Sequence, residues 1–319
     1  MVINIEDKKI CMVGIGGVGG FIGGALAKKY SHVAFFARGL RKESIQKKGL
    51  TIKSEYMGNY QVMPEKLTDK SEDLGMMDYV FISVKNYSLE QICKQISPMI
   101  SKKTVIIPIM NGTNPAERTR NYLGRGIVLD SLIYIVSGSE EDFTIVQKGK
   151  YATVHIGMKN PSDEEKKSII NVQKILNGAG VECVMDEDIE SVIWKKYVLN
   201  CAYNVITAYY SATTGELRKD PRRVQEFRAL LTEACLVGRK IGINLPNGLE
   251  EEHLNHFRNV QAEDATSSLR RDMDSEKPNE LETFSGYLLV LGKQYGLSLP
   301  VTEHFYNKLK IINSVLETK

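Results

Sequence analysis

The sequence predicts an α/β protein of two domains: an N-terminal doubly wound parallel sheet over residues 1–187 and a C-terminal all-helical domain over residues 188–319. Three observations predict this class. A glycine-rich turn follows the first apolar run, later apolar runs alternate with helix-like segments, and strand patterns nearly disappear beyond about residue 188. The 319 residues exceed one typical domain, so each part is long enough to bury its own core.

The first strand and the turn after it lie in residues 10–19, where an apolar run breaks into Gly14-x-Gly16-x-x-Gly19 and then into a helix-like segment. Gly14 permits a tight turn, Gly16 lets the backbone approach a pyrophosphate, and Gly19 lets the helix pack closely on the strand. An ordinary glycine turn is the alternative. The position favours a dinucleotide fingerprint of the Rossmann type, and the cofactor-binding residues predicted here are Gly14, Ile15, Gly16, Gly17, Val18 and Gly19.

The second strand is expected at residues 33–36 and should end beside the adenosine ribose of the cofactor. Enzymes that prefer NAD usually place an acidic residue there, whereas this chain has Arg38, with Arg41 and Lys42 close behind. Arg38, helped by Arg41 and Lys42, could hold a 2′-phosphate through a planar, permanently charged fork. The cofactor is therefore predicted to be NADP(H), and a solvated basic loop is the alternative.

Further strands are expected along the sheet, and polar residues follow two of them. The runs lie at 79–84, 104–109 and 126–129, with added strands at 148–157 and 181–184. Lys85 and Asn111 directly follow two of these strands, at the carboxyl edge where open α/β sheets bind ligands. Both are predicted to contact the cofactor or substrate; a loop polar residue or helix cap is the alternative.

The second domain should begin near residues 186–190, where acidic residues supply a helix start. Its first helix places Lys196, Asn200 and Asn204 at i, i+4 and i+8, as a polar stripe on an apolar helix. The stripe is either a structural network or a substrate-binding face. In carbonyl reduction an ammonium stabilises the negative charge that develops on oxygen and supplies the proton, which favours Lys196 over Lys195, because Lys195 lies off the stripe.

Composition narrows the function classes. A formal net charge of +3 is too small to argue for nucleic acid or a membrane surface, and no apolar span reaches membrane length. The five cysteines are scattered without metal-ligand spacing, which predicts reduced thiols, no metal site and a cytoplasmic protein. The apolar stretch 227–231 fits either a homodimer interface or the domain core.

Taken in chain order, these motifs resemble the ketopantoate reductases (2-dehydropantoate 2-reductases), and the resemblance covers nearly the whole chain. The matching segments are 14–19, Arg38, 83–85, 110–112, the Trp-x-Lys-x-x-x-Asn-x-x-x-Asn helix, 215–217, 267–272, Glu280, 286–288 and 295–300.

The resemblance implies NADPH-dependent reduction of 2-dehydropantoate to pantoate, a step toward pantothenate and coenzyme A. It implies that Lys196 is the proton donor, that Asn200, Asn204 and Ser268 bind the substrate, and that Lys85 and Asn111 contact the cofactor. It also implies that Glu280 is catalytic and lines the same cleft between the two domains, near the nicotinamide and Lys196, where its carboxylate would help keep the lysine charged until proton transfer. One position departs from the family, since Thr214 stands where some members have a substrate-binding asparagine. A reductase of another small 2-oxo acid, or a non-catalytic dinucleotide sensor, therefore remains as an alternative.

Overall fold

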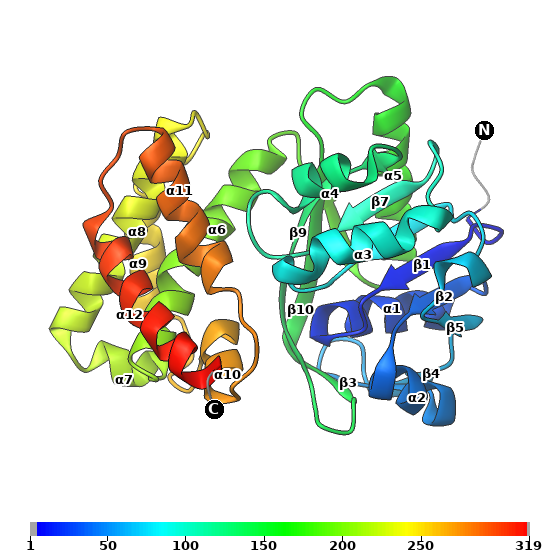
Figure 1. Ribbon diagram of the computed structural model, residues 1–319, viewed down its shortest axis with the longest axis horizontal. Helices are drawn as coiled ribbons and strands as arrows, with labels where there is room; N and C mark the ends of the chain where they lie inside the picture. Colours follow the sequence, from blue (N-terminus) through cyan, green and yellow to red (C-terminus); the bar gives the residue numbers. More distant parts are fainter. Residues whose placement is uncertain (1–4, 318–319) are drawn as a thin grey trace. The chain divides into compact units, whose positions relative to one another are not determined.

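The computed structural model describes residues 5–317, and the chain divides into two compact units. One unit extends to Ile189 and the other starts at Glu190 (Figure 1). Each unit has its own hydrophobic core and is described by itself.

The first unit contains a six-stranded parallel sheet in the order β5-β2-β1-β6-β7-β8. The strands expected at 33–36, 79–84, 104–109 and 126–129 are confirmed. The bounds are β1 Ile10–Val13, β2 Val33–Phe36, β5 Lys66–Thr68, β6 Tyr79–Ile82, β7 Val105–Pro108 and β8 Ile127–Val128.

Both faces of this sheet are buried, which explains why its strands are continuous apolar runs. Met12 and Phe35 belong to the core on one face, with helices α1 and α5, whereas Cys11 and Phe36 belong to the core on the other face, with α3 and α4. The helix bounds in this unit are α1 Gly17–Lys29, α2 Gly39–Lys48, α3 Leu89–Ile96, α4 Pro115–Leu123 and α5 Asp163–Gly178.

The added strands expected at 148–157 and 181–184 are also confirmed, but they belong to a second sheet that the sequence analysis did not anticipate. Its order is β11-β10-β3-β4, and β9 pairs antiparallel with β10. The bounds are β3 Leu50–Ser54, β4 Tyr60–Val62, β9 Asp130–Ser139, β10 Ile145–Gly157 and β11 Glu182–Met185.

Helix α1 packs against strands of both sheets, and its glycines make this possible. A Cβ at Gly23 would lie 3.0 Å from Cγ of Met12 in the first sheet, and a Cβ at Gly20 would lie 2.6 Å from Ile145 in the second. Real side chains at these positions would push the sheets apart. The helix that carries the fingerprint is therefore fixed on two sides.

The second unit is helical, with no strand among residues 190–317 (Figure 1). Helix α6 is part of the core of this unit, since Tyr197, Val198 and Ala202 are all fully buried. The bounds are α6 Ile189–Tyr209, α7 Thr214–Arg218, α8 Pro221–Lys240, α9 Leu249–Asn259, α10 Ser268–Asp274, α11 Tyr287–Gln294 after a π-helical turn Glu282–Gly286, and α12 Pro300–Glu317.

The core of the second unit accounts for the apolar stretch 227–231, and the cysteines of the chain are buried as well. Phe227, Leu230 and Leu231 are buried within the second unit, so the stretch 227–231 belongs mainly to the domain core. All five cysteines are buried and none forms a disulfide.

The start of α12 depends on a buried carboxylate from α8. Glu233 accepts hydrogen bonds from the backbone N–H groups of Val301 (2.9 Å) and Thr302 (2.8 Å). A negative charge at a helix N-terminus is favourable, and these amides have no partner within their own helix. Glu233 thus joins α8 to α12 inside the core.

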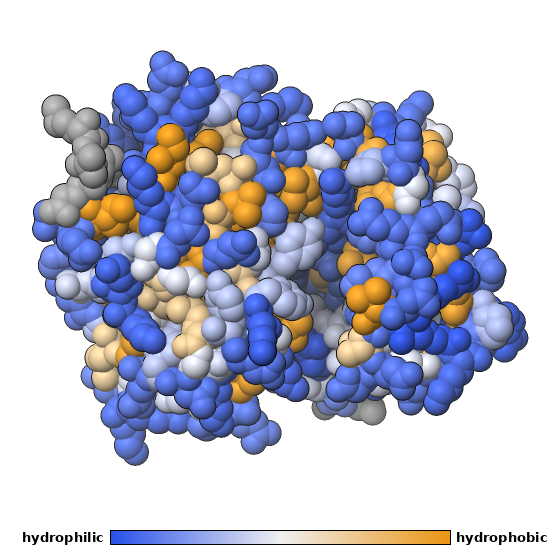
Figure 2. All heavy atoms as spheres, turned by 180° about the vertical axis from the view of Figure 1, so that it is seen from behind, coloured by the Kyte–Doolittle hydropathy of each residue, from blue (hydrophilic) through white to orange (hydrophobic). Residues whose placement is uncertain are grey.

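The surface seen in Figure 2 is mostly hydrophilic, with hydrophobic residues scattered over it. Of the helices that the structure describes, none combines the length and the apolar character needed to span a membrane.

Candidate functional site

The turn between β1 and α1 has the geometry that a bound phosphate requires. Gly14 has φ +86°, a conformation that favours glycine, and a Cβ there would collide with the carbonyl oxygen of Ser83. A Cβ at Gly19 would collide with the carbonyl oxygen of Gly14, so the helix and the turn are in close contact. In contrast, a Cβ at Gly16 would meet no atom within 4 Å.

Helix α1 starts directly beyond this open space. Its first turn contains no acidic residue, and no side chain caps its N-terminus. Unpaired backbone N–H groups and the helix dipole both favour an anion at such a position. The fingerprint residues therefore fit the pyrophosphate of a dinucleotide.

A pocket of about 170 Å³ lies beside the turn, and Arg38 is one of the residues that line it. Gly14 and Ile15 of the fingerprint line the same pocket, so the structure brings Arg38 and the turn together. Arg38 is exposed, and the lining contains a second arginine, Arg41, but no acidic residue. The full lining is Gly14, Ile15, Phe36, Ala37, Arg38, Arg41, Val84, Ser88 and Ile92.

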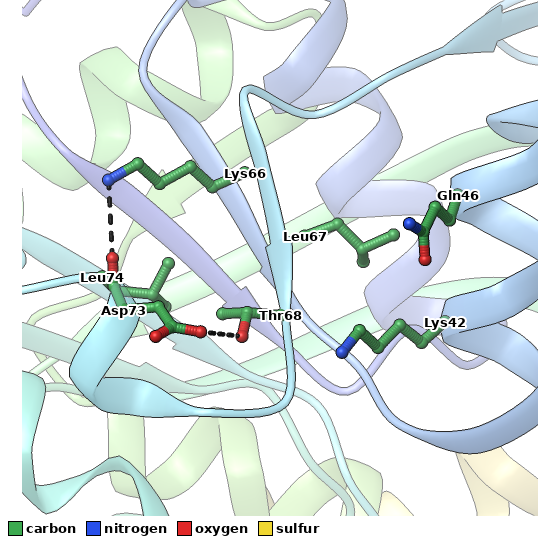
Figure 3. Close-up of a pocket in the computed structure, with 7 residues that line it drawn as sticks. All are labelled: Lys42, Gln46, Lys66, Leu67, Thr68, Asp73 and Leu74. Carbon is green, nitrogen blue, oxygen red and sulfur yellow. Dashed lines mark hydrogen bonds between the residues drawn. The ribbon is translucent and has the colours of Figure 1, made fainter.

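Lys42 does not line this pocket. Its ammonium pairs with Asp69 at 2.7 Å, and its side chain lines a separate surface pocket of about 410 Å³ between α2 and β5 (Figure 3). In that second pocket Thr68 donates to Asp73 at 2.8 Å, and Lys66 donates to the Asp73 carbonyl at 3.5 Å. Its polar groups bind one another, which gives no indication of a ligand.

Lys85 and Asn111 occupy the loops after β6 and β7, on the edge of the sheet where the fingerprint turn also lies. The buried side chain of Asn86 joins these loops, because its amide donates to the carbonyl oxygen of Asn111 at 2.9 Å. Its own oxygen accepts from Arg118 at 3.3 Å. Sequence reasoning missed Asn86 and Arg118; the only signal was a second polar residue directly after Lys85.

In the second unit, the polar stripe of α6 is a hydrogen-bonded network. The Asn204 amide nitrogen donates to the side-chain oxygen of Asn200 at 3.4 Å, and the Asn204 oxygen accepts from the Ser268 hydroxyl and the Leu269 N–H, each at 3.2 Å. Asn204 is only 4% exposed. The structure thus brings Asn200, Asn204 and Ser268 together at the start of α10.

A second contact between α6 and α10 supports this arrangement. The Thr207 hydroxyl donates to Ser267 at 2.7 Å, and the Ser267 oxygen accepts from the N–H of Arg270. Ser267, rather than Ser268, is therefore the N-cap of α10. Neither Thr207 nor Ser267 was among the expected site residues, because a buried hydroxyl has no distinguishing pattern in a sequence.

Lys196 has an unusual electrostatic environment one turn before Asn200. Burial lowers the pKa of its ammonium to about 8, and the nearby carboxylate of Glu280 opposes that shift. Glu280 is itself buried, directly before the helical turn that leads to α11. Lys196 itself is half-buried, so the lysine and the buried glutamate interact where water is only partly excluded.

Thr214, the departure from the family pattern, faces the interior of its own unit. It is fully buried; its hydroxyl lies 2.9 Å from the Tyr203 hydroxyl and donates to the Ala265 carbonyl oxygen at 3.3 Å. Two hydrogen bonds within the protein hold the hydroxyl, and the side chain is fully buried in its own unit, so it presents no polar group at the surface of that unit.

A glycine-rich turn on a doubly wound sheet, followed by a helical unit with a half-buried lysine beside a carboxylate, fits the class of dinucleotide-binding oxidoreductases. Two family models match the chain: "Ketopantoate reductase PanE/ApbA" over residues 10–161 and "Ketopantoate reductase PanE/ApbA C terminal" over residues 188–313. The chain therefore belongs to the ketopantoate reductase family.

Two curated relatives are similar to this chain over most of its length, and a solved structure shares its fold. An uncharacterized oxidoreductase, YkpB, of Bacillus subtilis is 31% identical over 95% of this chain and 98% of its own length. A 2-dehydropantoate 2-reductase of Mesorhizobium japonicum is 26% identical over 89% of this chain and 91% of its own length. Among solved structures, a D-mandelate dehydrogenase with NADH and anilino(oxo)acetate covers 97% of this chain and 99% of its own, with a TM-score of 0.87 and 17% identity.

Proposed function

We propose that this protein uses NADPH to reduce 2-dehydropantoate to pantoate, a step of pantothenate and coenzyme A synthesis. The observation that carries the proposal is the half-buried Lys196, which lies one helical turn from Asn200 and near Glu280 and whose pKa is lowered to about 8. A lysine with a pKa near neutrality can donate a proton and recover it, which a solvated lysine does poorly.

The first unit contains the residues that would hold the cofactor. The backbone of residues 14–19 and the N-terminus of α1 would bind the pyrophosphate, and Arg38 would bind the 2′-phosphate. Lys85 and Asn111, on the same edge of the sheet, would contact the rest of the cofactor. When bound, the dihydronicotinamide supplies a hydride for the carbonyl carbon of the 2-oxo acid.

Lys196 has two tasks in this proposal. Its ammonium stabilises the negative charge that develops on the substrate oxygen and then transfers a proton to that oxygen. Burial makes the proton easier to release, whereas Glu280 favours the charged form and keeps part of the lysine protonated at neutral pH. These opposing effects place the lysine near the pKa at which a general acid is most effective.

Asn200 and Ser268 are the side chains that we assign to the oxygens of the substrate. Asn204 contributes to the same site chiefly by orienting them, because its oxygen already accepts two hydrogen bonds and its nitrogen donates to Asn200. Removing Asn204 would leave both contact residues without support and would leave the first N–H groups of α10 with one acceptor fewer.

A second candidate is the reduction of a different small 2-oxo acid. The buried Thr214 favours it, since a threonine whose hydroxyl is used internally cannot replace a substrate-binding amide. The likeness to a D-mandelate dehydrogenase also supports it, because the fold accommodates hydroxy acids with other side chains. A dinucleotide sensor without catalysis is the third candidate; it has no need of a proton donor with a lowered pKa.

The test is oxidation of NADPH, followed by absorbance, with 2-dehydropantoate and with a panel of other 2-oxo acids at equal concentration, each repeated with NADH. Preferred turnover of 2-dehydropantoate with NADPH supports the first candidate, and preference for another acid supports the second. Lys196→Ala should abolish turnover and retain cofactor binding, whereas Lys195→Ala, the adjacent control off the stripe, should retain both. No turnover of any acid by the wild type would support the sensor.

A further inference from the structure

We propose that Arg41, held in place by the β9–β10 hairpin, is a second anion-binding residue of the pocket beside the fingerprint and grips the 2′-phosphate of NADP(H) together with Arg38. The inference rests on the proposed function, and it adds a residue and a positioning element that the cofactor motif does not contain.

The charge of the pocket is the first observation. Arg38 and Arg41 both line it, and neither forms an ion pair with a carboxylate in the part of the chain that the structure describes. Two guanidinium groups beside one cavity repel each other unless an anion lies between them. A phosphate monoester with about two negative charges fits this requirement, and guanidinium groups bind phosphate in a bidentate manner.

The environment of Arg41 is the second observation. Its Nη2 donates to the Ser139 hydroxyl at 2.9 Å, its guanidinium carbon lies 4.7 Å from the centre of the Phe143 ring, and its Nη1 is buried without a hydrogen-bond partner. Leaving a buried donor unpaired is unfavourable, and more so when the donor belongs to a charged group. Burial also lowers the pKa of Arg41, although the group stays charged at neutral pH.

The hairpin that holds Arg41 has a strained tip. Phe143 has φ +69°, which is unfavourable for a residue with a side chain. Asp142 fixes the turn by accepting hydrogen bonds from both the backbone N–H and the hydroxyl of Thr144, each at 2.9 Å. Strain of this kind persists where the surroundings enforce it and often accompanies a ligand-binding role.

The base of the same hairpin packs against the fingerprint. The Ser137 hydroxyl donates to the Gly17 carbonyl oxygen at 2.9 Å, and a Cβ at Gly17 would lie 2.9 Å from the Cα of Gly138. One hairpin therefore contacts both the phosphate-binding turn and Arg41. It fixes the distance between the two, which is the condition for binding two phosphates of one ligand at once.

The adjacent Lys42 provides a contrast on the same helix. It is equally basic, but its ammonium pairs with Asp69 and lines the other pocket. Arg41 and Lys42 therefore carry the same charge but differ in their partners: Lys42 pairs with a carboxylate, whereas Arg41 lines the pocket beside the fingerprint.

The test is calorimetric binding of adenosine 2′,5′-bisphosphate and of AMP to the full-length protein. Arg41→Ala should weaken binding of the bisphosphate by about tenfold or more and change the affinity for AMP by less than about twofold. The reason is that only the bisphosphate carries the 2′-phosphate. Lys42→Ala is the matched control and should change neither. Phe143→Leu removes the ring that Arg41 contacts but keeps the arginine. It should weaken binding of the bisphosphate by roughly a few fold, the effect expected from the loss of one cation–π contact.

The outcomes separate this inference from the proposed cofactor. If Arg38→Ala weakens the bisphosphate and Arg41→Ala does not, the role of Arg41 is refuted and NADPH preference stands. If the wild type binds the bisphosphate no more tightly than AMP, the NADPH preference itself fails. Should Arg41→Ala unfold, as judged by thermal melting, Arg41→Lys decides: it keeps the charge, loses the fork, and should still show a selective loss for the bisphosphate.

Discussion

The lowered pKa of Lys196 makes a quantitative prediction about how the reaction depends on pH. Burial lowers this pKa from 10.5 to about 8, with Glu280 acting in the opposite sense. At about 1.4 kcal/mol per pKa unit, the protein disfavours the charged lysine by ~3 kcal/mol relative to water. The reductive reaction needs the ammonium form, so its rate should fall about tenfold per pH unit above a pH of about 8.

The assay is kcat/KM for the best 2-oxo acid, measured with saturating NADPH from about pH 6 to about pH 10. The reverse reaction, oxidation of the hydroxy acid with NADP+, needs neutral lysine and should rise through the same pKa. A reductive rate that stays constant to about pH 10 would refute the assignment of Lys196 as the acid. So would a Lys196→Ala variant within about tenfold of the wild type, because general acids contribute roughly 10²–10⁴-fold.

The same pKa has a consequence for stability that does not depend on catalysis. Between about 8 and 10.5 the unfolded chain binds a proton at Lys196 that the folded chain has released. The free energy of unfolding should therefore decrease as pH falls from 10.5 toward 8 and then level off, as far as this group is concerned. Lys196→Met should remove this pH dependence in urea unfolding, with Lys195→Met as the control.

Three further predictions follow from packing and charge. The methyl group of Gly16→Ala would lie in open space, so this variant should weaken dinucleotide binding, measured by calorimetry, at unchanged stability. The methyl group of Gly20→Ala would clash with the second sheet, so this variant should lower the free energy of unfolding in urea by ~1–3 kcal/mol. Glu233→Ala removes the acceptor at the start of α12 and should cost ~2–4 kcal/mol in urea unfolding. Glu280→Gln removes the carboxylate that raises the pKa of Lys196, so the reductive pH profile should move to lower pH; an unmoved profile contradicts the pairing.

The sequence predicted the first sheet well for a physical reason. Parallel strands buried on both faces are written as continuous apolar runs, and β2 and β6 are of this kind. The helical unit was equally accessible, because α6 carries a period of 3.6 residues that also places Lys196, Asn200 and Asn204 on one face. Local pattern was sufficient in both cases.

The second sheet could not be predicted in the same way. Strand β3 is only five residues long, and its parallel partner β10 lies roughly 90 residues further along the chain, with Ile52 opposite Ile145. Nothing local in either segment specifies that pairing. The sequence analysis predicted a single strand at 148–157 and not the hairpin of β9 and β10. The contacts of that hairpin with Arg41 were therefore not predicted.

Buried polar residues were the other gap. Asn86 and Thr207 are defined by partners that are distant in sequence, and their own neighbours in the chain are unremarkable. Asn204 illustrates the difference between a pattern and a contact. The helical spacing put it on the predicted face, but only the hydrogen bonds to Ser268 and Leu269 reveal that its oxygen is already occupied.

The glycines of the fingerprint turn and of α1 have different physical tasks. Gly14 and Gly16 are the positions that we assign to the ligand: Gly14 adopts a positive φ at the turn, and Gly16 has open space beside it. Gly20 and Gly23 serve the fold, because α1 packs between two sheets and has no room for side chains there. Loss of cofactor binding therefore has two causes in this helix, a blocked site or an unfolded one. Only a stability measurement made alongside the binding assay distinguishes a cofactor residue from a packing residue four positions away.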